Sequence, residues 1–271
     1  MTNSYKIRKF KKEDLGQVVS LIDDHDEDDA KDAKNTLLNS NNLVAINENG
    51  IILGVSGYEY VNGTDYTAYL SWTYVLKSKL REGIGSKLLN HALESAKKDG
   101  CRLIVLKISD YTESGSDTSI YDGARQLYLK KGFKVQIYCP NFYDEGEGVE
   151  IMTLRLDGSK PSRPNIKDEK PMLRFSRLKE IIETNGAYSF DWIVKNSFLT
   201  MKNRSFSVKD LEVGIDAAKK SGARVIFLTF PSNLPLIHEP LQQAGFKLLG
   251  RVEDYYEDGV NELHFIKTLD L

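Results

Sequence analysis

The chain has 271 residues, of which 41% are hydrophobic and 28% charged, and its formal net charge is −2. This length allows one large domain or two small ones, and the composition is that of an ordinary globular protein. So small a net charge provides no general attraction to nucleic acid. The segment MTNSYKIRKF lacks the apolar centre of a secretory signal, and no apolar run approaches about 18 residues. We therefore expect neither secretion by that route nor a membrane span.

Two cysteines, Cys101 and Cys139, are too few for a disulfide framework. Cys101 begins an apolar segment that is typical of a buried strand. We therefore expect reduced thiols and a cytoplasmic location.

Hydrophobic periodicity predicts a mixed order of strands and helices before residue 157. Apolar residues alternate in the strand segments and recur at helical spacing in others, as at Leu15, Val18 and Ile22. The dipeptides Asn49-Gly50 and Asn62-Gly63 are typical of hairpin turns. The predicted strands are 5–10, 43–47, 51–60, 66–76, 101–108, 133–140 and 148–156, and the predicted helices are 13–22, a short one ending near Leu38, 84–98 and 122–131.

A glycine turn joins the strand predicted over 66–76 to the helix predicted over 84–98. Gly83 and Gly85 lack Cβ atoms, so an anion can approach the backbone there. The first helical N–H groups have no partner within the helix, and the positive end of the helix dipole lies at the same point. Because Arg81 and a neighbouring lysine add positive charge, we predict a pyrophosphate site in this turn.

Two common nucleotide-binding loops do not account for this turn. The sequence has no G-x-x-x-x-G-K-[ST] pattern, which excludes a Walker A loop. A dinucleotide fingerprint would need a third glycine where Leu88 stands.

A second motif follows the turn. Residues 124–133 read ARQLYLKKGF and fit the pattern A-x-x-L-Y-x-x-x-G-F. The turn and this segment together resemble the GNAT superfamily of N-acetyltransferases over roughly the first 157 residues. The resemblance implies an α/β fold with a mixed sheet. It departs from the family at Leu80, where the family's turn usually has Gln or Arg.

The resemblance also implies roles for individual residues. Acetyl-CoA is the implied cosubstrate, and Tyr128 is the implied acid that protonates the leaving CoA thiolate. The backbone around the turn should hold the pyrophosphate and the backbone before it the pantetheine arm. The implied donor-binding residues are Tyr74, Val75, Leu76, Arg81, Glu82, Gly83, Ile84, Gly85 and Ser86.

The acceptor amine needs a base, because an aliphatic ammonium with a pKa near 10.4 is almost fully protonated at neutral pH. Glu59 is the candidate, since it lies on the strand beside the one expected to pair with pantetheine. An exposed hairpin glutamate explains Glu59 equally well. Ser71 and Thr73 could instead hold a water molecule that accepts the proton.

An acidic run over 23–29 (DDHDEDD) lies between the first two predicted helices. It would attract a cationic acceptor such as a polyamine, a diamine or a lysine peptide, with Asp26 as the candidate contact. The alternative is a solvated loop that supplies helix N-caps. We reject a calcium loop, because Asp29 stands where glycine is needed and Asn35 where glutamate is needed. No metal site is predicted. Tyr143 is a further candidate for the acceptor pocket.

Residues 158–171 contain most of a proline-rich, charged stretch that we interpret as a linker between domain 1–157 and domain 172–271. The second domain carries a diverged repeat of the first. AKKDGCRLIVL at 96–106 aligns with AKKSGARVIFL at 218–228, and GFKVQIYCPNFYDEG at 132–146 aligns with GFKLLGRVEDYYEDG at 245–259. We therefore predict a smaller, partial GNAT-like domain after the linker.

The second copy lacks the residues expected to carry the chemistry. In the alignment Gly83 and Gly85 correspond to Ser205 and Ser207, and Tyr128 corresponds to Leu241. We therefore predict a degenerate copy with a structural role.

The sequence predicts an acetyl-CoA-dependent N-acetyltransferase in which a primary amine attacks the thioester directly. The acceptor would be a small cationic amine or an amine of a peptide, and the chain a monomer or homodimer without nucleic-acid or membrane partners. The alternatives are a non-catalytic acyl-CoA-binding regulatory module and an enzyme for a longer acyl donor.

Overall fold

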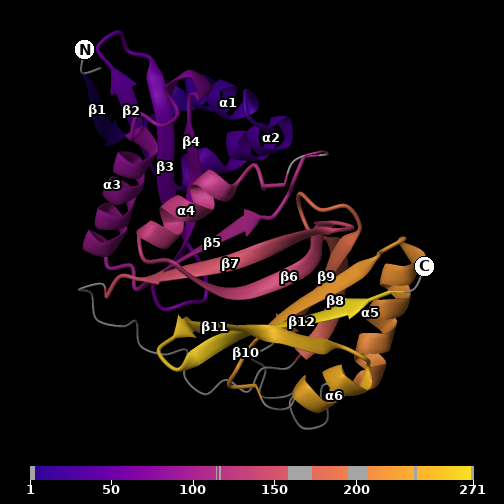
Figure 1. Ribbon diagram of the computed structural model, residues 1–271. Helices are drawn as coiled ribbons and strands as arrows, with labels where there is room; N and C mark the ends of the chain where they lie inside the picture. Colours follow the sequence, from indigo (N-terminus) through magenta and orange to yellow (C-terminus); the bar gives the residue numbers. More distant parts are fainter. Residues whose placement is uncertain are drawn as a thin grey trace. The chain divides into compact units, whose positions relative to one another are not determined.

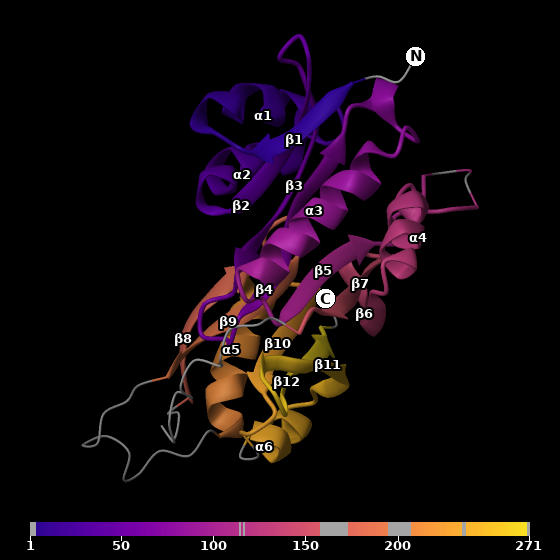
Figure 2. The same cartoon turned by 90° about the vertical axis from the view of Figure 1, so that its left-hand side faces the viewer.

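The computed structural model describes residues 4–113, 115, 117–157, 173–194, 207–234 and 237–269 (Figures 1 and 2). The predicted linker lies outside the described residues. The strands are β1 (Tyr5–Lys9), β2 (Asn41–Asn47), β3 (Ile52–Tyr60), β4 (Thr67–Val75), β5 (Leu103–Ser109), β6 (Lys134–Asp144), β7 (Glu147–Arg155), β8 (Leu173–Glu180), β9 (Ala187–Val194), β10 (Val225–Pro231), β11 (Lys247–Glu257) and β12 (Val260–Thr268). The helices are α1 (Leu15–Asp23), α2 (Glu27–Thr36), α3 (Ile84–Lys98), α4 (Asp122–Lys130), α5 (Val208–Lys220) and α6 (His238–Gln243), with short 3₁₀ turns η1 (Lys12–Asp14), η2 (Leu37–Asn39) and η3 (Lys77–Lys79).

The described chain divides into two compact units. The first contains 4–106 and 154–157, and the second contains 107–153 and the described residues from 173 onward. This division follows contacts in space, and the sequence-based boundary at 157 stays a prediction. No helix in the described ranges is long and apolar enough to cross a membrane.

The first sheet is mixed, as predicted. Its strand order is β1-β2-β3-β4-β5-β7-β6. Pairing is antiparallel from β1 to β4 and between β6 and β7, whereas β4 and β5 are parallel. The predicted bounds of helix 84–98 are confirmed by α3, and both hairpin turns are confirmed with Gly50 and Gly63 at φ 79°.

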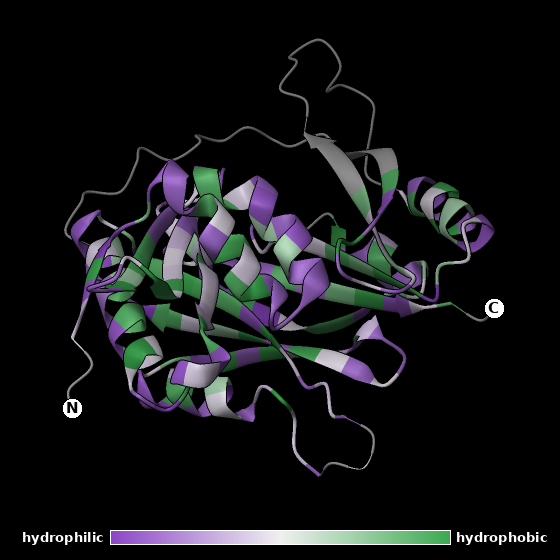
Figure 3. Cartoon of the chain, turned by 90° about the horizontal axis from the view of Figure 1, so that it is seen from above, coloured by the Kyte–Doolittle hydropathy of each residue, from purple (hydrophilic) through white to green (hydrophobic). Residues whose placement is uncertain are grey.

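Helices cover both faces of β1–β4 (Figures 1 and 2). Val44 packs with α1 and α2, whereas its neighbour Ala45 packs with Ile84 and Leu88 of α3. Successive strand residues point to opposite faces, so α3 lies across the sheet from α1 and α2. Figure 3 shows the resulting pattern, with largely hydrophobic strands and helices that carry both hydrophobic and hydrophilic residues.

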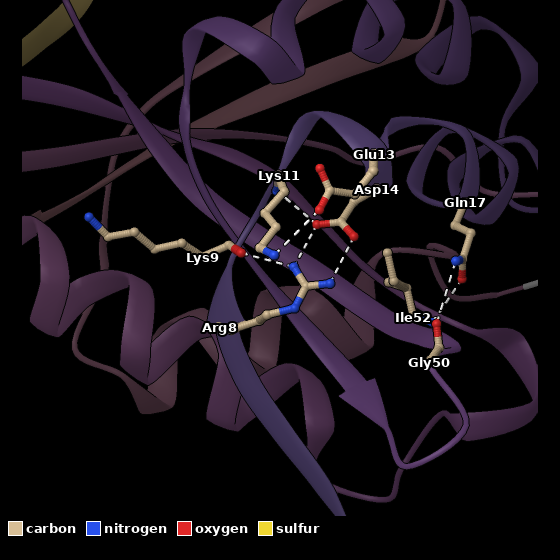
Figure 4. A network of polar contacts seen from close by, with 8 residues as sticks. All are labelled: Arg8, Lys9, Lys11, Glu13, Asp14, Gln17, Gly50 and Ile52. Atoms are coloured by element: carbon tan, nitrogen blue, oxygen red, sulfur yellow. Dashed lines mark hydrogen bonds and ion pairs between the residues drawn. The ribbon is translucent and has the colours of Figure 1, made fainter.

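A polar network fixes the entry into α1 (Figure 4). The Arg8 guanidinium donates to both Asp14 carboxylate oxygens, at 2.6 and 2.8 Å, and the Lys11 N–H donates to Asp14 Oδ2 at 2.7 Å. Asp14 is buried, and its hydrogen bond from Arg8 is the main reason that its pKa is lowered. Gln17 accepts from the Ile52 N–H at 3.1 Å and thereby ties α1 to β3.

We expect Asp14→Asn to lower the free energy of unfolding by about 2 kcal/mol at pH 7, because it removes charge-assisted hydrogen bonds. A carboxylate whose pKa is lowered by folding stabilises the protein above its ordinary pKa, near 3.9, and loses that effect as pH falls through the lowered value. The difference between wild type and variant should therefore shrink below about pH 4. Urea unfolding at several pH values measures it. Glu13→Gln, at an exposed side chain, is the control. A difference that does not change with pH would contradict the assignment.

The second unit contains a five-stranded sheet in the order β11-β12-β10-β9-β8. Its parallel pair is β9 with β10, and the other neighbours are antiparallel. This order reproduces β6-β7-β5-β4-β3 of the first sheet.

Local geometry also agrees at positions that the sequence repeat aligns. Asn141 and Asp254 both have φ 53°, and each side-chain Oδ1 accepts a 2.8 Å hydrogen bond, from the N–H of Gly146 and of Gly259 respectively. The described structure thus shows the same β-β-α-β-α-β-β order twice along the chain.

Candidate functional site

The strands β4 and β5 pair over a short length only. Thr67–Tyr69 pairs with Leu103–Val105, and β4 then continues to Val75. A register irregularity between β3 and β4 falls in the same stretch, between the pairs Val55↔Tyr74 and Gly57↔Ser71. The part of β4 after Tyr69 therefore extends past its register with β5. Its backbone N–H and C=O groups on the side away from β3 are not in that register.

The turn before α3 has the geometry of an anion site. Gly83 is the N-cap of α3 and adopts φ 80°, the left-handed region that favours glycine. It provides no side-chain acceptor, and the first hydrogen bond within the helix runs from the Lys87 N–H to the Gly83 carbonyl at 3.1 Å. The N–H groups of residues 84–86 therefore have no partner within the helix, and no acidic residue lies in its first turn.

Packing holds this turn against the end of β4. Ile84 is buried and packs with Val75 and Leu88. A Cβ on Gly85 would lie 3.3 Å from Val75 Cγ2, so glycine allows the close approach of helix and strand. The predicted donor residues Val75, Ile84 and Gly85 thus lie together in the first unit.

The charged residues of the turn are exposed. Lys79 and Glu82 form an ion pair of 3.0 Å, which offsets the charge of that lysine. Arg81 is exposed with φ 64°, and Leu80, which stands where the family usually has Gln or Arg, is also exposed. Backbone groups and Arg81 are therefore the main positive features of the turn.

Two side chains that sequence reasoning did not select contact the end of β4. His25 Nε2 lies 2.8 Å from the Val75 carbonyl, so this nitrogen carries the hydrogen and donates. The Tyr74 hydroxyl donates to Asp29 Oδ2, and the rings of His25 and Tyr74 lie 5.3 Å apart. The acidic segment therefore reaches the strand that is predicted to hold pantetheine.

Asp26 caps α2. Its Oδ1 accepts from the N–H groups of Asp28 and Asp29, at 2.9 and 3.0 Å. This is the N-cap role that was the alternative interpretation of the acidic run. Contact between Asp26 and an acceptor stays a prediction.

Glu59 and the candidate water-binding hydroxyls lie apart in the register. Glu59 is exposed, accepts a hydrogen bond of 3.2 Å from Ser40, and pairs with Tyr69 across the strands. Thr73 Oγ1 lies 2.9 Å from Ser56 Oγ and donates to the Ser71 carbonyl at 3.0 Å.

The remaining candidates belong to the second unit. Tyr128 is buried on α4, and its ring packs edge-on against Phe133 with centroids 5.5 Å apart. Arg125 on the same helix forms an ion pair of 2.7 Å with Glu150 of β7. Tyr143, on β6, is half-buried, and its carbonyl accepts from the Asn185 N–H at 2.7 Å.

The helix equivalent to α3 in the second unit has a different N-terminus. Ser207 Oγ accepts from the Asp210 N–H, and the Asp210 carboxylate accepts from the Ser207 N–H at 3.2 Å. This capping box fills the N-terminus of α5 with its own side chains and places an acid in its first turn. Leu241, the equivalent of Tyr128, is fully buried in the core. Ser205 lies outside the described residues.

Helical spacing was the signal that could have identified Asp29. Asp29, Ala33 and Thr36 recur at intervals of four and three along α2, and Thr36 Oγ1 accepts from Trp72 Nε1 at 2.9 Å. That stripe of α2 faces β4, so a helical-wheel reading of residues 27–36 would have directed Asp29 toward the sheet. His25 carried no such signal, because it lies between the two helices.

Within the described ranges, no group of three or more His, Cys, Asp or Glu residues is arranged to hold a metal ion. Cys101 and Cys139 are both buried, and burial raises the pKa of each thiol to about 12.

Comparison with known proteins gives one family match. Residues 39–135 match the acetyltransferase (GNAT) domain family. No curated protein sequence matches the chain.

Several solved structures are similar to part of the chain. An N-acetyltransferase from Staphylococcus aureus Mu50 has 25% identity and a TM-score of 0.45, with coverage of 56% of this chain and 99% of that one. The ribosomal-protein-S18-alanine N-acetyltransferase from Escherichia coli has 21% identity, a TM-score of 0.44 and coverage of 58% and 97%. The aminoglycoside 6′-N-acetyltransferase from Enterococcus faecium has 16% identity, a TM-score of 0.47 and coverage of 59% and 99%. With TM-scores below 0.5, these likenesses add nothing to the family match. The matched segment contains both the glycine turn and the A-x-x-L-Y-x-x-x-G-F motif, so residues 39–135 are similar to the GNAT acetyltransferase domain.

Proposed function

We propose that the chain is an N-acetyltransferase that transfers the acetyl group of acetyl-CoA to a primary amine. The observation that carries the proposal is the N-terminus of α3, where Gly83 adopts φ 80° and leaves the first helical N–H groups without a side-chain cap. An N-terminus of this kind binds phosphate groups through N–H donors and the helix dipole.

The donor would lie along the end of β4. The pyrophosphate would bind residues 81–86, and the backbone of Tyr74, Val75 and Leu76 would hold the pantetheine arm and polarise the thioester carbonyl. The early end of the β4–β5 register supports this placement, because an extended ligand could bind along the edge of β4 beyond Tyr69.

The reaction would be a direct displacement. The amine nitrogen forms a bond to the thioester carbon, the carbon–sulfur bond breaks, and Tyr128 gives a proton to the leaving sulfur. A base removes the proton of the acceptor ammonium, and Glu59 is the candidate from sequence. Asp26 and Tyr143 would contact the acceptor. No covalent acyl-enzyme is needed.

The second unit's own sheet would be a degenerate GNAT-like half with a structural role. The repeated strand order supports this proposal, and the capping box of Ser207 and Asp210 argues against a second pyrophosphate site. A non-catalytic acyl-CoA-binding module is the competing function, and the presence of Tyr128 favours the enzyme.

Calorimetric titration with acetyl-CoA tests the donor site. We expect one acetyl-CoA per chain, followed by release of CoA thiol when spermidine, cadaverine or a lysine peptide is added. Two sites per chain would contradict a degenerate second copy. Binding without thiol release from any amine would favour the non-catalytic module, and no binding would overturn both proposals.

A further inference from the structure

Asp29 connects the acidic segment to the predicted donor strand. Its Oδ2 accepts a hydrogen bond from the Tyr74 hydroxyl, and Tyr74 directly precedes Val75, whose carbonyl contacts His25. The contact between Thr36 and Trp72 holds the same stripe of α2 against β4. A carboxylate from α2 is therefore fixed beside the last residues of β4.

The surroundings of Asp29 favour its neutral form. Asp29 is half-buried, and burial is the main reason that its pKa is raised, while the Tyr74 hydrogen bond acts in the opposite direction. The charges of Asp28 and Asp32 on α2, and of its N-cap Asp26, also raise the pKa. From the other elements packed against it, Tyr74 of β4 faces the carboxylate, and His25 lies against the Tyr74 ring.

No lysine, arginine or histidine of the described residues forms an ion pair with Asp29, although Lys31 on the same helix pairs with Glu27 and Asp28. A half-buried carboxylate among three like charges is stabilised by an arriving cation or by a proton. A protonated amine delivers both.

We propose that Asp29 is the general base for the acceptor and selects a cationic amine. The assignment rests on the proposed N-acetyltransferase function. The acceptor ammonium binds the Asp29 carboxylate and transfers one proton to it, and the neutral nitrogen then attacks the thioester carbon. The second proton lost by the nitrogen leaves to solvent as the amide forms, and the thiolate takes its proton from Tyr128.

The position of Glu59 makes it less suited to this step. Glu59 is opposite Tyr69, which lies five residues before Tyr74. At 3.2–3.4 Å per residue, this places Glu59 about 16 Å along the strand from the contact of Asp29. Its carboxylate is exposed to solvent and accepts a hydrogen bond from Ser40.

The test compares Asp29→Asn with Glu59→Gln, since both changes keep the side-chain shape. Acetyl-CoA affinity is measured by calorimetry, and kcat/KM for spermidine is measured from pH 5 to pH 9.5 by release of CoA thiol. We expect Asp29→Asn to bind acetyl-CoA within about twofold of wild type and to lose about 10²-fold or more in kcat/KM at neutral pH. The rate of wild type should fall at low pH as the carboxylate is protonated. In Asp29→Asn, kcat/KM should instead rise steadily with pH over the whole range, because this variant can react only with amine that is already neutral in solution.

The remaining outcomes separate this assignment from the proposed function. Equal activity of Asp29→Asn and wild type, or a slow variant that keeps the wild-type pH profile, would overturn the role of Asp29 and leave the acetyltransferase intact. A loss of about 10²-fold in Glu59→Gln with an active Asp29→Asn would return the role to Glu59. If the wild-type chain binds acetyl-CoA but acetylates none of spermidine, cadaverine and the lysine peptide, the proposed function is overturned. The assignment of Asp29 as base is then overturned too.

Discussion

Replacement of Tyr128 by Phe is expected to lower kcat for acetyl transfer by about 10²-fold while the affinity for acetyl-CoA stays within about twofold. The change removes only the hydroxyl that is proposed to protonate the CoA thiolate. The ring of Tyr128 keeps its contact with Phe133, because that contact is made by the aromatic faces and edges. Stopped-flow or steady-state release of CoA thiol with the best amine of the panel measures the loss.

Tyr188→Phe is a matched control for this change. Tyr188 lies on β9 of the second unit, and its hydroxyl makes a contact of 3.5 Å with Glu180. Tyr188→Phe therefore also removes one tyrosine hydroxyl, at a position outside the A-x-x-L-Y-x-x-x-G-F motif. We expect the control to keep kcat within about twofold, as is usual for a substitution away from a reacting group. If Tyr128→Phe turned over as fast as the control, the acid role of Tyr128 would be wrong and water would be the proton donor.

Strong local signals explain why the helices and strands before residue 157 could be predicted. Helix α3 follows an N-terminal glycine turn and carries a continuous apolar stripe that includes Ile84, Leu88 and Ala92, so the predicted bounds are confirmed. The strand predicted over 133–140 is longer in the structure and continues through Pro140 to Asp144. Proline usually ends a strand, but here a β-bulge with Asn141 at φ 53° lets the pairing resume.

The candidate site was predictable only in part. A glycine turn leaves a pattern in the sequence, because φ and the close packing of Gly85 against Val75 restrict the residue type. Helical spacing along α2 directs Asp29 toward the sheet, but the choice of Tyr74 as its partner leaves no pattern, since it depends on how α2 lies against β4. The acidic run offered seven neighbouring polar residues of similar character, and the start of α2 at Glu27 distinguishes Asp29, which faces the sheet, from Asp26, which caps the helix.

Gly83→Ala is expected to weaken acetyl-CoA binding by about tenfold or more, which corresponds to about 1.4 kcal/mol. Gly83 adopts φ 80°, where a Cβ is strained by about 1 kcal/mol, and the turn would relax toward negative φ. In the present backbone, a Cβ at this position meets no atom within 4 Å. It would therefore stand in open space at the N-terminus of α3, where the pyrophosphate is proposed to bind. Calorimetric titration with acetyl-CoA measures the affinity, and urea unfolding measures the accompanying loss of stability.

Gly222→Ala separates the effect of strain from the effect on the ligand. Gly222 adopts φ 76° after α5, and a Cβ there also meets no atom within 4 Å, so both substitutions carry the same backbone strain in open space. Both should therefore lower the free energy of unfolding by about 1 kcal/mol. Because the N-terminus of α5 is filled by Ser207 and Asp210, only the change at Gly83 should alter acetyl-CoA affinity. An equal loss of affinity in the two variants would mean that strain spreads through the fold, and unchanged affinity in both would place the pyrophosphate elsewhere than at the start of α3.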